Sequence, residues 1–209
     1  MRLIKRILAV GLFSLGLATM ASAQSCPAQR PSGDVNRAID ARPVNQELFA
    51  SLVLYYTNVE RCRRGMRAVQ MTNGTQRSAE ILAEGMARDR NYSHTLNQAG
   101  VRTLSDRLHY SGESFRRGGE NIALNFVYAL NGRPFTGGGC NFRYQGTGQP
   151  VPRHSYATMA EELMTSWMAS PGHRENILNR RFTRMGAAIG VDARGQQCGQ
   201  IYAAQAFAG

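Results

Sequence analysis

The chain has 209 residues and a net charge of +11, from 25 Lys and Arg against 14 Asp and Glu. This length fits one domain with a substantial buried core. The arginines are spread along the chain, so we interpret them as a solvated surface, with attraction to anionic lipid or acidic polymer as the alternative. The sequence lacks helix-turn-helix, RNA-recognition and zinc-finger patterns, which argues against a nucleic-acid partner.

The first 23 residues have the features of a signal peptide. Arg2, Lys5 and Arg6 precede an apolar run over residues 7–20, and small residues at 21–23 form a cleavage signal. The run is shorter than the ~20 apolar residues that span a bilayer. We therefore expect an exported protein, secreted or periplasmic, with no transmembrane segment in the mature chain.

Four cysteines follow the predicted cleavage site: Cys26, Cys62, Cys140 and Cys198. An even number in an exported protein predicts two disulfides, and three pairings are open. The sequence has no C-x-x-C unit, so neither redox catalysis nor a structural zinc site has support.

After the signal peptide, the chain begins with a proline-containing segment that is followed by a predicted helix. Residues 24–44 contain three prolines and little periodicity, which predicts a loose N-terminal arm that Cys26 can tie down. From Asn45 to Cys62 apolar residues recur every three or four positions. This spacing predicts a helix that Asn45 caps and Gly65 ends.

Two further helices are predicted from the same periodicity. One spans residues 76–90 after a turn at residues 73–74, and the other spans residues 156–170. The second has Trp167 on its apolar face, so we expect Trp167 in the core, and Pro171 stops the helix.

A Gly- and Pro-rich stretch at about 125–155 looks like a long irregular insertion, with Cys140 as a tether. Residues 185–191 and 200–207 alternate or run apolar, which predicts two strands. Helices followed by late strands indicate a layered α+β domain over residues 45–209.

Three short motifs occur in a recognisable order after the signal peptide. They are Tyr92-Ser93-His94-Thr95, Gly119-Glu120-Asn121-Ile122-Ala123 and Ser170-Pro171-Gly172-His173-Arg174-Glu175-Asn176-Ile177-Leu178. Together they resemble the bacterial branch of the CAP superfamily, whose SCP-like extracellular domain also occurs in cysteine-rich secretory, venom-antigen and pathogenesis-related proteins. The resemblance implies a three-layer α-β-α sandwich with a central cleft lined by two His and two acidic residues. Some members hold a divalent metal in that cleft.

By motif position, His94 and His173 match the two histidines and Glu120 matches one acidic residue, while Ser170 stands where the second acid usually lies. Two imidazoles and a carboxylate make a plausible divalent site, zinc for example, with His94, Glu120 and His173 as ligands. The same groups suit general acid–base chemistry without metal. Alternatively they are structural, with Glu120 satisfying backbone N–H groups at a helix N-terminus.

Side chains near these motifs have predicted supporting roles. We expect Arg107, Asn121 and Asn176 to hold loops by hydrogen bonds. His109 and His154 fall outside the family pattern and are predicted to be surface or loop residues, although His154 borders the insertion and is positioned to overhang the cleft.

Three functions remain open, and the sequence leaves undecided whether the chain is an enzyme. The first is a module that binds a lipid, another small apolar molecule or a protein partner. Aromatic residues of the insertion would then form an apolar lip, unless they fold back into a small core of their own. They are Phe126, Tyr128, Phe135, Phe142 and Tyr144. The second is a metal-dependent hydrolase of peptide or cell-wall material, and the third is a structural envelope component with a vestigial cleft.

Overall fold

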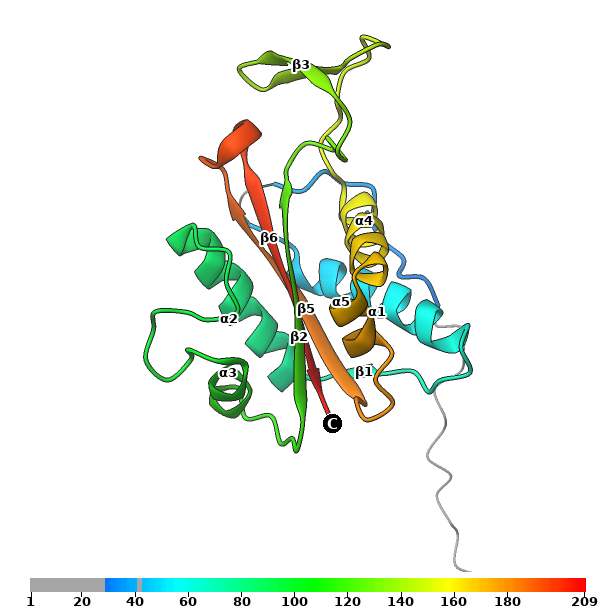
Figure 1. Ribbon diagram of the computed structural model, residues 1–209, viewed down its shortest axis with the longest axis vertical. Coiled ribbons are helices and arrows are strands. Elements are labelled where there is room, and N and C mark those ends of the chain that lie inside the picture. The colour runs from blue at the N-terminus through cyan, green and yellow to red at the C-terminus, as the bar shows by residue number, and fades with distance from the viewer. Residues whose placement is uncertain (1–28, 41–42) are drawn as a thin grey trace, which may run out of the picture.

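The computed structural model describes residues 29–40 and 43–209, so the predicted signal peptide and Cys26 lie outside the described part. A central sheet separates two helical layers (Figure 1). The helices are α1 (Gln46–Cys62), α2 (Asn73–Asp89), α3 (Leu104–Tyr110), α4 (Tyr156–Ala169) and α5 (Pro171–Ile177), with a short 3-10 turn, η1 (Gln196–Cys198). The strands are β1 (Gln70–Met71), β2 (Gly118–Phe126), β3 (Phe135–Gly138), β4 (Asn141–Tyr144), β5 (Arg184–Asp192) and β6 (Gln200–Ala208). The predicted α-β-α sandwich is confirmed.

The central sheet has the strand order β1-β5-β6-β2, so β2 forms one edge. Strands β5 and β6 pair antiparallel along their full length, as do β6 and β2, whereas β1 pairs parallel with β5. The two late strands are confirmed. Glu120 lies inside β2, so its alternative role at a helix N-terminus is wrong.

Two glycines of β5 let α2 lie directly on the sheet. A Cβ on Gly186 would collide with the backbone of Gln76, and one on Gly190 would collide with the carbonyl of Ala83. Neither position requires left-handed backbone. The absence of a side chain therefore sets the close approach of helix and strand.

Helix boundaries follow from their caps. The Asn45 side chain accepts a hydrogen bond from the Leu48 N–H at 3.0 Å, which confirms the predicted cap of α1. Helix α2 begins at Asn73, earlier than expected, because Thr72 and Thr75 form a capping box. Residues 73–74 are thus the first turn of the helix rather than a turn before it. Pro171 ends α4 as predicted and also begins α5, where its fixed φ suits the first helical position.

The described part of the N-terminal arm is bound rather than loose. Ile39 is fully buried, and its N–H donates to the carbonyl of His154 at 2.9 Å. The carbonyls of Arg37 and Val35 accept hydrogen bonds from Tyr156 and Ala157. These contacts attach the arm to the first turn of α4.

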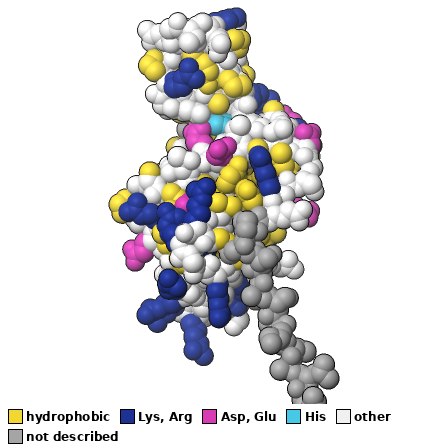
Figure 2. Space-filling view, turned by 90° about the vertical axis from the view of Figure 1, so that its right-hand side faces the viewer, with side chains coloured by type: hydrophobic (Ala, Val, Ile, Leu, Met, Phe, Trp, Pro, Cys, Tyr) yellow, Lys and Arg dark blue, Asp and Glu magenta, His cyan; other side chains and the backbone are white. Residues whose placement is uncertain are grey.

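The insertion is folded rather than irregular. Strands β3 and β4 form a hairpin that projects beyond the sheet, and space-filling shows it as a separate lobe (Figures 1 and 2). Its aromatic residues form a small core in which the Phe142 ring lies 5.1 Å from Tyr128 and 5.4 Å from Phe135. The Cys140–Cys198 disulfide ties the lobe to the turn between β5 and β6, and Cys62 is also disulfide-bonded.

Candidate functional site

Glu120 and His94 contact each other directly. Nδ1 of His94 lies 2.9 Å from Oε1 of Glu120, which projects from β2. The Glu120 side chain is nearly buried, whereas the His94 side chain is 54% exposed. The carboxylate therefore holds one ring nitrogen of an imidazole that otherwise faces solvent.

Arg107 fixes the other side of Glu120. Its guanidinium is fully buried and donates to Oε2 of Glu120 at 2.6 Å. The same nitrogen donates to the backbone carbonyl of His94 at 3.2 Å. Arg107 thus aligns both members of the pair. The sequence indicated a supporting role for Arg107 but not this contact with the carboxylate.

His173 comes from α5, on the opposite side of β2. Its carbonyl accepts from Nδ2 of Asn121 at 3.2 Å, and Nδ2 of Asn176 donates to the carbonyl of Glu120 at 3.1 Å. Burial lowers the pKa of His173 below its ordinary value, and the neighbouring His94 lowers it further. The structure therefore brings His94, Glu120 and His173 together around the edge strand.

A buried polar chain supports this arrangement from the core. Nδ2 of Asn121 donates to Oε1 of Gln205 at 3.0 Å, and Nε2 of Gln205 donates to Oγ1 of Thr57 at 2.8 Å. All three side chains are fully buried. Because successive strand residues point to opposite faces, Glu120 faces α3 while Asn121 faces α5 and α1.

Residues 54–207 match the family described as the Cysteine-rich secretory protein family, CAP. The chain belongs to the CAP family. The matched segment contains the three site residues, so their arrangement belongs to the CAP domain rather than to the arm.

Individual proteins similar to this chain share only a modest fraction of its sequence. The uncharacterized protein YkwD of Bacillus subtilis is 29% identical over 145 residues, which are 69% of this chain and 43% of YkwD. An extracellular SCP-domain protein of Bacillus anthracis has a TM-score of 0.52 at 23% identity, covering 78% of this chain and 41% of that one. An outer surface protein of Borrelia burgdorferi has a TM-score of 0.50 at 16% identity, covering 83% and 97%. The chain spans about two fifths of the two Bacillus proteins, and the structural likenesses establish the fold alone.

The Glu120 carboxylate of this CAP domain is engaged within the protein, which leaves the two imidazoles as the side chains available to a ligand. Each oxygen of Glu120 already accepts a hydrogen bond, one from Arg107 and one at His94. A carboxylate on one ring nitrogen is the usual support of a histidine that binds metal through the other. Within residues 29–40 and 43–209, no three His, Cys, Asp or Glu side chains form a metal-binding group.

Ser170 lies between α4 and α5, where its backbone ends one helix and begins the other. Its side chain makes no capping hydrogen bond, and its carbonyl accepts from Arg174. Within the described part of the chain, the Ser170 hydroxyl makes no hydrogen bond to the two histidines or to Glu120.

The remaining histidines differ from each other. His109 is exposed and packs against Phe115 in a tilted arrangement, with ring centroids 4.9 Å apart. His154 lies in the loop before α4, as predicted, but it is 1% exposed and therefore not a surface residue. Its Nε2 lies 3.3 Å from Oε2 of Glu162, and burial lowers the pKa of His154 more than Glu162 raises it. His154 is buried between the arm, whose Ile39 N–H donates to its carbonyl, and α4, whose Thr158 contacts its Nδ1, and no local pattern revealed this packing.

Proposed function

We propose that this CAP domain is a binding module whose two histidines, His94 and His173, hold a divalent metal such as zinc, with Glu120 orienting His94. The observation that carries the proposal is the pairing of Glu120 with Nδ1 of His94 while buried Arg107 holds the other carboxylate oxygen. With Nδ1 of His94 held by the carboxylate, Nε2 is the ring nitrogen directed toward a ligand. The lowered pKa of His173 keeps its imidazole neutral at neutral pH, as ligation requires.

The decisive variant is Glu120→Gln. Arg107 only donates, so the Gln oxygen must face Arg107 and its NH₂ group must face His94. Nδ1 of His94 would then accept a hydrogen bond, and its proton would move to Nε2, which could no longer ligate. We expect zinc affinity to fall by about 10–100-fold, measured by calorimetry on chelator-stripped protein.

Two further variants test whether the two histidines bind the zinc ion. His94→Ala/His173→Ala should abolish one-site zinc binding, whereas His109→Ala removes an exposed imidazole and should leave it unchanged. Wild-type protein that takes up no zinc, or a double variant that binds as wild type does, would refute the metal proposal.

A hydrolase of peptide or cell-wall material uses the same residues differently. It needs Glu120 as a base toward a water molecule, but both carboxylate oxygens are engaged within the protein. The arrangement therefore favours a Glu120 that orients His94 over a Glu120 that abstracts a proton from water. Substrate turnover lost in Glu120→Gln, with zinc affinity intact, would reverse this preference.

A small apolar ligand is the second candidate, and it has its own site. A hollow of about 500 Å³ at the base of the hairpin is lined by Phe126, Leu130, Pro134 and Phe135, with Glu162 at its margin. Acidic side chains gather at this waist between lobe and body (Figure 2). We expect an apolar dye to bind here and Phe135→Asp to remove it. Leu124→Asp, an exposed position on β2, is the matched control.

Export is proposed with the same function. The signal-like first 23 residues and the Cys140–Cys198 disulfide support a secreted or periplasmic location, where disulfides persist. The similar proteins described as extracellular and as an outer surface protein agree with it. Within the described residues no helix has the length and apolar character needed to cross a membrane. Fractionation of cells expressing the full chain tests the location, and retention in the cytoplasm would contradict it.

A further inference from the structure

The outer edge of β5 is closed by two glutamine side chains instead of a strand. Strand β1 pairs with β5 only at Arg184 and Met185. Beyond them, Gln76 bonds both the N–H and the carbonyl of Ala187, at 3.1 and 3.0 Å. Gln46 does the same for Ile189, at 3.1 and 2.7 Å. Each side-chain amide supplies one donor and one acceptor, as a peptide group of a neighbouring strand would.

The next position in this series is Val191. In an antiparallel pair, every second residue directs its N–H and carbonyl away from its partner strand. Val191 therefore presents both groups to the same edge as Ala187 and Ile189. Val191 is half-buried, and no group in the described part of the chain hydrogen-bonds to its backbone on that edge. The edge thus has two positions filled by amides and a third that is open.

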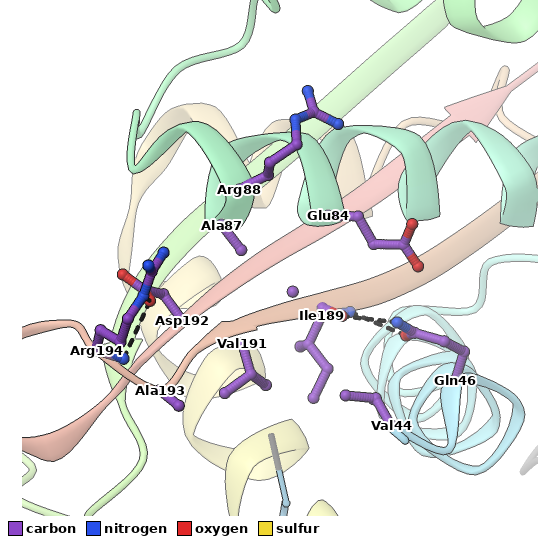
Figure 3. A pocket seen from close by; sticks show the side chains of 11 residues that line it. Val44, Gln46, Glu84, Ala87, Arg88, Ile189, Val191, Asp192, Ala193 and Arg194 are labelled. Atoms are coloured by element: carbon purple, nitrogen blue, oxygen red, sulfur yellow. Dashed lines mark hydrogen bonds and ion pairs between the residues drawn. The ribbon is translucent and has the colours of Figure 1, made fainter. Parts of the chain in front are cut away.

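A hollow of about 870 Å³ lies beside this open position. It is formed by the start of α1, the second half of α2 and the end of β5 (Figure 3). Its volume is enough for several residues of an extended chain rather than a single solvent molecule. A ligand entering it meets the backbone of Val191 beside Gln46.

Glu84 brings a carboxylate to the hollow without a direct ion pair, and Arg88, one turn further along α2, lies close enough for the two charges to interact. Glu84 extends from α2 toward Gln46, whereas Arg88 points away from the strand (Figure 3). Asp192 is paired with Arg90 at 2.7 Å and with Arg194. Glu84 has no ion-pair partner in the part of the chain that the structure describes. A cationic side chain on the ligand would meet it.

We propose that this edge of β5 binds an extended peptide, whose backbone pairs with Val191 and whose Lys or Arg side chain reaches Glu84. Strand addition to an exposed edge is a common mode of peptide recognition, with main-chain hydrogen bonds giving affinity and side-chain pockets giving specificity. The two glutamines set the register, because the bound peptide group takes the next place in their series. The proposal is independent of the metal site on β2, at the other edge of the sheet.

The probe is the capped peptide acetyl-Thr-Val-Lys-Val-Thr-amide, titrated into ¹⁵N-labelled protein and followed by NMR. We expect saturable shifts of the Val191 backbone amide and the Gln46 side-chain amide. Val191→Pro removes the donor at a place where an edge strand tolerates proline, and affinity should fall by about tenfold. Val191→Ala keeps the donor and is the matched control.

The role of the Glu84 charge is tested by variants that leave the backbone unchanged. This second test therefore remains valid if Val191→Pro fails to fold. Glu84→Gln, or replacement of the peptide's Lys by Glu, should each weaken binding several-fold. Equal affinity for the Lys and Glu peptides, equal affinity of the Val191→Pro and Val191→Ala proteins, or no shift at Val191 would overturn the proposal.

Discussion

At the scale of single residues, a buried arginine outside the candidate site joins distant segments of the backbone. Arg61 is 1% exposed and donates to four backbone carbonyls, those of Arg67, Ile177, Asn179 and Phe182, at 2.8–3.0 Å. It therefore joins the end of α1 to the loop that connects α5 with β5. From the sequence alone, an arginine in an amphipathic helix is expected on the solvated face.

We predict that Arg61→Ala lowers the free energy of unfolding by about 3 kcal/mol or more, because it leaves several buried carbonyls without donors. Arg63→Ala is the matched control. That side chain is 70% exposed and pairs with Glu60, so its loss should change stability by about 0.5 kcal/mol or less. Urea denaturation measures both. Similar values for the two variants would contradict the role given to Arg61.

The buried His154 predicts a pH dependence of stability. Burial lowers its pKa in the folded state, so the unfolded chain takes up the proton first as the pH falls. The stability that the neutral imidazole provides is complete above the unfolded pKa of about 6.5 and is lost as the pH falls from there toward the lowered folded pKa. Unfolding free energies at pH 7.5 and 5.5 should therefore differ less in His154→Phe than in wild type. His109→Phe should keep the wild-type difference, and an unchanged slope in His154→Phe would show that another group controls it.

At the scale of elements, helix α2 lies directly against strand β5, with Gly186 and Gly190 at the contact. We expect Gly190→Ala to cost about 1–3 kcal/mol, because its methyl group would meet the Ala83 carbonyl of α2. Gly172→Ala in α5 meets nothing within 4 Å and should be neutral or slightly stabilising. Thermal unfolding of the two variants checks the contrast, and a harmless Gly190→Ala would mean that α2 can move away from β5.

At the scale of the whole molecule, a disulfide joins the projecting lobe to the sandwich. The Cys140–Cys198 bridge spans 58 residues of sequence. Its removal by Cys140→Ser/Cys198→Ser should destabilise the fold by up to about 4 kcal/mol, on the chain-entropy estimate for a loop of this length. Hydrogen exchange should rise first in β3 and β4, whose own core is small. A uniform rise over the main sheet instead would show that the lobe and the sandwich unfold as one unit.

Local signals in the sequence predicted helices α1, α2 and α4 and the late strands β5 and β6, but not the short helices α3 and α5. Side-chain caps such as Asn45 act over three residues, and the apolar stripes act over a turn or two, so both can be read along the chain. The resemblance of the short motifs to the CAP superfamily predicted His94, Glu120 and His173 as site residues. These three lie around β2 in the structure, and their role stays a prediction.

Contacts between distant segments decided the rest. Glu120 lies in a strand because β2 pairs with β6, some 80 residues away, and its partner Arg107 comes from a separate helix. The insertion acquires order from aromatic rings on different strands, and the open edge at Val191 exists because β1 is short. These features depend on which segments meet in space. A local pattern carries no information about that, because burial and hydrogen-bond partners are set only when the layers pack.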